Sequence, residues 1–61
     1  MKTFYAEAMN KKGKVFDTME TDKIFEIRLW ASERHADIVN IYLNNRDGSF
    51  TRWMVLKYDN K

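Results

Sequence analysis

The sequence predicts a small α+β domain with the element order β-β-α-β-β, in which one helix covers one face of a four-stranded antiparallel sheet. Three observations lead to this fold class. Two stretches alternate apolar and polar residues around an Asn-x-x-Gly centre, a pattern typical of β-hairpins. The segment between them combines helix-forming residues with an amphipathic spacing. The chain has 61 residues, so we expect a single domain over residues 1–61.

The first hairpin is predicted from the alternating stretches Thr3–Met9 and Val15–Glu20. The sequence Asn-Lys-Lys-Gly between them suits a type I turn, because Asn favours its first position and Gly accepts the positive φ that closes the loop. A three-residue loop that starts after Asn10 would place Ala8 opposite Phe16.

The helix is predicted over Lys23–Ala36, where Ile24, Ile27 and Ala31 fall on one face. Its end, with the sequence ASERHA, is rich in good helix formers and contains no Gly or Pro. The side-chain oxygens at Thr21–Asp22 are candidates for the N-cap. The first half of this segment also alternates like a strand, so a five-stranded all-β barrel is the alternative fold.

The second hairpin is predicted over Ile38–Tyr58. Its centre, Asn-Arg-Asp-Gly, has the same Asn-x-x-Gly pattern as the first loop and predicts the same turn. The same turn would place Trp53 opposite an isoleucine, a favourable cross-strand pair, and direct it towards the helix. A two-residue type I′ turn at Asp47–Gly48 is the alternative. It would shift the register by one residue and turn Met54 and Leu56 inward instead.

Composition excludes several kinds of site. The chain has no cysteine and one histidine, so disulfides and a structural zinc site are excluded, and we expect neither metal nor cofactor. Eleven basic and nine acidic residues give a net charge of +2, which is too small an excess to mark a strong polyanion binder. There is no apolar run of about 20 residues for a membrane span and no signal-peptide pattern, so a cytoplasmic protein is expected.

No catalytic constellation is evident, and an enzyme is not expected. The candidate partners of His35 in sequence are Ser32 and Glu33, and we interpret the histidine instead as favourable charge at the helix C-terminus. Glu7 and Asp17 would lie across from each other on the first hairpin. We interpret them as part of a solvated strand face.

 The two glutamates of the predicted helix, Glu26 and Glu33, fall on the side opposite its apolar face, and we interpret them as solvated.

The helix-free face of the sheet is the predicted binding surface. One helix covers only one face, whereas the second hairpin is apolar on both, and an uncovered apolar patch marks an interaction surface. Met and aromatic residues are common at such surfaces. The residues assigned to it are Ile38, Tyr42, Arg52, Met54 and Leu56. We therefore expect a non-catalytic interaction module, a possible regulator or inhibitor, that binds a second copy of itself as a homodimer or another protein.

A nucleic-acid-binding accessory protein is the alternative function. Lysines in the first loop, an arginine in the second and an aromatic residue on an open sheet would hold a single strand. The candidate contacts are Lys11, Lys12, Lys14 and Arg46. Acidic residues interleave with these cations along the chain and weaken the field that would attract phosphates.

Overall fold

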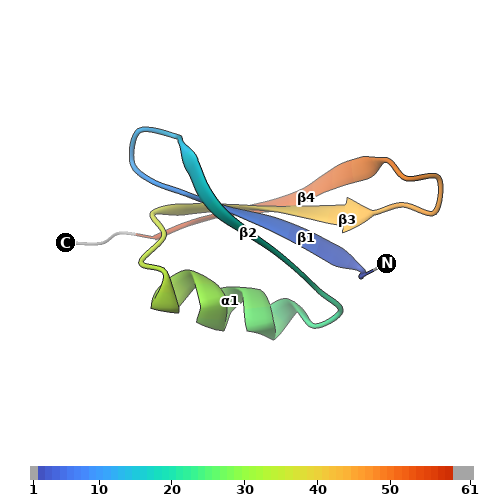
Figure 1. The fold of residues 1–61 in the computed structure, drawn as a ribbon, viewed down its shortest axis with the longest axis horizontal. Helices are drawn as coiled ribbons and strands as arrows, with labels where there is room; N and C mark the ends of the chain where they lie inside the picture. The colour runs from blue at the N-terminus through green and yellow to red at the C-terminus, as the bar shows by residue number, and fades with distance from the viewer. Residues whose placement is uncertain (1, 59–61) are drawn as a thin grey trace.

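A computed structural model describes residues 2–58 and confirms the predicted β-β-α-β-β fold. The elements are β1 (Phe4–Met9), β2 (Val15–Thr21), α1 (Ile24–Glu33), β3 (Ile38–Asn44) and β4 (Phe50–Lys57). The strands form one antiparallel sheet in the order β2-β1-β3-β4, and α1 lies along one side of it (Figure 1). The five-stranded barrel is wrong because α1 is helical. Residues 59–61, for which the sequence predicts a frayed end, lie outside the described residues.

The core lies between α1 and the two inner strands. Alternate residues of β1 and β3 point towards the helix, and α1 contributes Ile27 and Ala31 from the opposite side. The alanines of β1 are small, so the helix backbone can approach the sheet closely. The buried cluster consists of Ala6, Ala8, Ile27, Ala31, Ala36, Val39 and Ile41. No aromatic residue belongs to it within residues 2–58, so the large rings lie at its edges or on the outer surfaces.

Both hairpin loops adopt the predicted turn. In each, the N–H of the first asparagine donates to the carbonyl four residues later, at 3.0 Å in the loop 10–14 and 2.9 Å in the loop 45–49. The glycine N–H donates back to the asparagine carbonyl at 2.9 and 3.1 Å. Gly13 and Gly48 have φ of 81° and 89°, a region that a residue with a Cβ enters only with strain.

A bulge in β4 changes the register of the second hairpin. Tyr42 pairs with Arg52, as the predicted turn requires, but Ile41 pairs with Met54, which leaves Trp53 as an extra residue. The predicted pair of Ile41 with Trp53 is therefore wrong. A β-bulge of this kind places two residues of one strand opposite one residue of the other.

The first hairpin contains a bulge in its returning strand as well. Met9 pairs with Val15 and Ala8 with Asp17, so Phe16 has no partner in the register. The predicted pair of Ala8 with Phe16 is wrong for the same reason as in the second hairpin. In both cases the extra residue is aromatic and slightly less than half exposed.

The bulge in β4 corrects the predicted binding surface. Every residue after an extra residue moves to the other face of the sheet, because side chains alternate along a strand. Met54 and Leu56 consequently pack against the core on the helix side, and their assignment to the helix-free face is wrong. Val55 takes the helix-free face instead. The second hairpin thus has the three-residue loop that we preferred. Its inward residues, however, are Met54 and Leu56, which the alternative two-residue turn predicted.

The helix ends in a left-handed residue. The N–H of His35 donates to Ser32 O at 3.2 Å, and the N–H of Ala36 donates to Ala31 O at 3.0 Å. These two bonds form a Schellman motif, whose first residue after the C-cap has a positive φ. His35 occupies that position with a φ of 55°. α1 therefore stops at Glu33, three residues before the predicted end.

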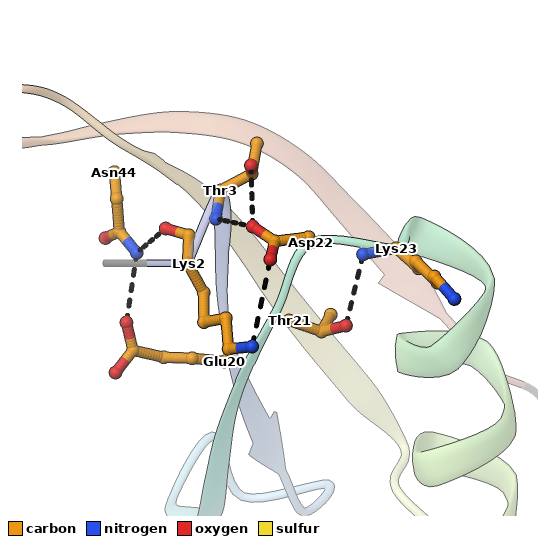
Figure 2. A network of polar contacts seen from close by, with 7 residues as sticks. All are labelled: Lys2, Thr3, Glu20, Thr21, Asp22, Lys23 and Asn44. Atoms are coloured by element: carbon orange, nitrogen blue, oxygen red, sulfur yellow. Dashed lines mark hydrogen bonds and ion pairs between the residues drawn. The ribbon is translucent and has the colours of Figure 1, made fainter.

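The start of the helix is held by a polar network rather than by a side-chain cap. The N-cap is Lys23, and no side chain caps it, so the predicted cap at residues 21–22 is wrong. Figure 2 shows the Asp22 carboxylate directed at Thr3 and Lys2. Its Oδ1 accepts from Thr3 N at 2.9 Å and from Thr3 Oγ1 at 3.0 Å. Thr21 is buried, and its Oγ1 accepts a hydrogen bond from Lys23 N at 3.1 Å.

Candidate functional site

The helix-free face is the side of the sheet opposite α1, and it is formed by alternate residues of all four strands. Cross-strand pairing determines which residues share this face, because partners in the register point to the same side. Its members are Tyr5, Glu7, Met9, Val15, Thr18, Glu20, Ile38, Asn40, Tyr42, Asn44, Phe50, Arg52, Val55 and Lys57.

Three rings form an aromatic cluster at one end of this face. Tyr5 and Tyr42 are cross-strand partners on the two inner strands, with ring centroids 5.9 Å apart. Phe50 from β4 lies 5.3 Å from the ring of Tyr5 and 6.3 Å from that of Tyr42. Each such pair contributes about 0.5–1.5 kcal/mol beyond its buried area. The cluster is nevertheless open to solvent, since Phe50 is 57% exposed.

A carboxylate lies beside the cluster. Glu7 Oε1 accepts from the Tyr42 hydroxyl at 3.2 Å, and Oε2 accepts from the Tyr5 hydroxyl at 3.4 Å. Together with Phe50 these residues line a hollow of about 340 Å³. Burial, and then the charge of Glu7 and its hydrogen bond, raise the pKa of the Tyr5 hydroxyl above its usual value. The phenol therefore stays protonated and remains a donor to Glu7 at neutral pH.

Charges of opposite sign lie on opposite halves of the helix-free face. Glu20 is on the outer strand β2, and Glu7 is on β1 beside it. Arg52 and Lys57 are both on the other outer strand, β4. The ion pairs recorded among residues 2–58 join other residues, Lys2 with Asp22 and Arg34 with Asp17. The carboxylates of this face accept hydrogen bonds from neutral groups, Glu20 from Asn44 Nδ2 at 3.1 Å and Glu7 from two phenols, so their charges are not neutralised by a cation in these ion pairs.

The opposite end of the face is mainly apolar. Met9, Val15 and Ile38 lie in one row across three strands, which Lys57 continues on β4, and a polar row that includes Glu7 and Asn40 separates them from the rings. Asn40 Nδ2 lies 2.8 Å from the thioether sulfur of Met9. The predicted patch is therefore divided into an aromatic end and an aliphatic end.

The structure brings together part of the predicted surface. Ile38, Tyr42 and Arg52 lie on the helix-free face as predicted. Sequence reasoning missed Glu7 and Phe50 as members of the site. The sequence did contain a signal for Phe50. It lies between the loop and the bulge, where the predicted register holds, and that register places it on the helix-free face opposite Asn44.

The predicted nucleic-acid contacts do not form one patch. Lys11, Lys12 and Lys14 lie in the loop between β1 and β2, whereas Arg46 lies in the loop between β3 and β4. Figure 1 shows these loops at opposite ends of the sheet, in a molecule with a long axis of 39 Å. The carboxylate of Glu7 also lies among the rings on which bases would stack, and it repels phosphates.

The predicted carboxylate pair is separated by the fold. Glu7 pairs with Thr18 and lies on the helix-free face, while Asp17 pairs with Ala8 on the helix side. The expectation that the two face each other is wrong because of the bulge at Phe16. Asp17 instead forms an ion pair with Arg34, with 2.9 Å between Oδ2 and Nε.

Among residues 2–58, the His, Asp and Glu side chains form no group of three or more that could hold a metal ion. The single helix in this range is too short to cross a membrane. Comparison of the chain with protein-family models, with curated proteins and with solved structures gave no match.

Proposed function

We propose that this protein is a non-catalytic interaction module that self-associates through its helix-free face. The observation that carries the proposal is the aromatic cluster of Tyr5, Tyr42 and Phe50, which is held in place by Glu7 and left open to solvent. Aromatic residues are enriched at protein interfaces because they bury a large area at a small cost in side-chain entropy.

The distribution of charge favours a second copy as the occupant of this face. Acidic residues occupy the β2–β1 half and basic residues the β4 edge, so the face is complementary to itself when a second copy is turned over upon it. A partner of a single charge sign would be attracted by one half and repelled by the other.

The size of the face sets the expected affinity. Four strands at about 4.8 Å spacing, each six to eight residues long at about 3.3 Å per residue, give a sheet of roughly 20 Å by 25 Å. A stable interface buries about 800 Å² on each partner. The outline of this face, about 500 Å², is smaller than that area, so the whole face has to be buried and we expect dissociation constants in the micromolar range.

Sedimentation equilibrium between 5 and 500 µM, about two decades around the expected constant, tests the proposal. The wild-type chain should pass from the mass of one chain to that of two. Tyr42→Glu should keep the chain monomeric, because it removes a ring and adds a carboxylate beside Glu7. Phe50→Glu, at a more exposed position on an outer strand, provides the same test if Tyr42→Glu fails to fold.

Leu29→Glu is the matched control. Leu29 is 60% exposed on the outer side of α1, away from the helix-free face. The control should associate like the wild-type chain. A wild-type chain that stays monomeric over the whole range contradicts the proposal, and so does a Leu29→Glu variant that associates as poorly as Phe50→Glu.

A further inference from the structure

A single row of side chains crosses the helix-free face from an acid to a base. Tyr5 pairs with Glu20 on one side and with Tyr42 on the other, and Tyr42 pairs with Arg52. The row therefore reads acid, ring, ring, base over the strands β2, β1, β3 and β4. Glu7 lies on β1 next to this row and adds a second carboxylate to its acidic half.

The geometry points to one arrangement of the dimer, in which Arg52 of each copy binds Glu20 and Glu7 of the other. The two sheets face each other across a two-fold axis that runs parallel to the strands, between β1 and β3. This inference rests on the self-association proposed above. It adds the partner residue for the acidic half of the face and the register of the two sheets.

The symmetry operation explains why these residues meet. A two-fold rotation about an axis along the strands exchanges β2 with β4 and β1 with β3, and it leaves the position along the strands unchanged. Arg52 of the second copy then lies over Glu20, and the ring of Tyr42 lies over that of Tyr5. Aligned sheet packing tolerates this arrangement, because the strands of the two sheets stay within about 30° of each other.

The acidic half suits an arginine in particular. Both carboxylates neighbour Tyr5, because Glu20 is its cross-strand partner on β2 and Glu7 accepts from its hydroxyl at 3.4 Å. A guanidinium group can stack on a ring and donate several hydrogen bonds to carboxylates at the same time. Glu7 uses one hydrogen bond per oxygen for the two phenols, and each carboxylate oxygen can accept a second one.

The other face-to-face arrangement brings like charges together. A two-fold axis across the strands would place each strand over its own copy. The basic residues Arg52 and Lys57 would then lie over β4 of the second copy, which carries the same two cations. Glu20 would lie over β2 of the second copy, which carries the same carboxylate. Opposed like charges in an interface suppress such pairings, so the charge pattern selects the axis along the strands.

Two charge-reversed chains test the arrangement. In Arg52→Glu, residue 52 of each copy meets Glu20 and Glu7 as acid against acid, and in Glu20→Arg the two contacts between positions 20 and 52 become base against base. Each variant alone should associate at least tenfold more weakly than the wild-type chain. An equimolar mixture should form a heterodimer that is much tighter than either variant's homodimer, because both contacts between positions 52 and 20 are again acid against base and only Glu7 of the Glu20→Arg chain faces a carboxylate. Sedimentation of the mixture, with one chain fluorescently labelled, measures this.

Arg28→Glu is the matched control, since it makes the same change of charge at an exposed position of α1. Arg28→Glu should associate like the wild-type chain. When it is mixed with Glu20→Arg, it should not form the tight heterodimer that Arg52→Glu forms. Circular dichroism of each variant verifies folding, and Glu20→Lys replaces Glu20→Arg if the latter is unfolded.

The outcomes separate this inference from the proposed function. A dimer that Phe50→Glu disrupts, but that neither charge reversal weakens, overturns the arrangement and leaves self-association standing. Two weakened variants that fail to pair in the mixture also overturn the arrangement. A monomeric wild-type chain overturns both.

Discussion

Trp53 lies against Phe4 on the helix side of the sheet, with the ring centroids 5.3 Å apart and the ring planes inclined at 37°. Trp53 is also the extra residue of the bulge in β4, because Tyr42 pairs with Arg52 and Ile41 with Met54. Phe4 packs against the buried core from β1. The contact thus links the bulge on an outer strand to an inner strand two positions away in the sheet.

Trp53→Ala should lower the free energy of unfolding by about 1–2 kcal/mol, because it removes an aromatic pair and part of the apolar cover of the sheet. Urea denaturation followed by circular dichroism measures the change. Phe25→Ala is the control: Phe25 is 56% exposed on α1 and forms no ring pair among residues 2–58. An equal loss in the two variants would show that the contact with Phe4 has no specific stabilising role.

His35→Gly should stabilise the protein by about 0.5–1 kcal/mol. The residue has a φ of 55°, a conformation in which Gly lacks the steric cost that other residues bear. Thermal and urea denaturation should show the gain. His35→Ala keeps a Cβ and should give no gain, so a glycine variant no more stable than the alanine variant would contradict this explanation of the helix end.

Two exposed carboxylates should make stability depend on pH in the acid range. Hydrogen bonds from Thr3 lower the pKa of Asp22, and hydrogen bonds from Ser49 lower that of Asp47. A carboxyl with a lowered folded pKa stabilises the fold above its unfolded pKa of about 3.9, and this contribution is lost as the pH falls through the folded value. The free energy of unfolding should therefore decrease below about pH 4.

The double variant Asp22→Asn, Asp47→Asn should flatten this acid limb. An amide oxygen can still accept the same hydrogen bonds but does not titrate. Urea denaturation at intervals from about pH 2 to pH 7, a span that includes the range below about pH 4 in which these carboxyls titrate, measures the slope. Glu33→Gln, which removes an exposed helix carboxylate outside both networks, should leave the slope unchanged. Equal slopes in the wild-type chain and the double variant would contradict the prediction.

Local sequence predicted the elements because their signals act over a few residues. Alternation indicates the strands, amphipathic spacing indicates α1, and the Asn-x-x-Gly loops formed as predicted at both positions. The helix end was predicted less well, because the amino acids after Glu33 are helix formers and the turn at His35 is stabilised by the burial of Ala36. The candidate site was predicted in part, through Ile38, Tyr42 and Arg52.

By itself, the sequence determined the fold class, the order of its elements and the two loops, since each depends on propensities and hydrogen bonds within a short segment. Only the tertiary structure decided which side chains share a face. An extra residue in a strand is accommodated where its side chain finds a packing partner, as Trp53 does with Phe4, and that partner is distant in sequence. The bulge then moves Met54 to the core and leaves Arg52 opposite Tyr42, and so it sets the composition of the helix-free face.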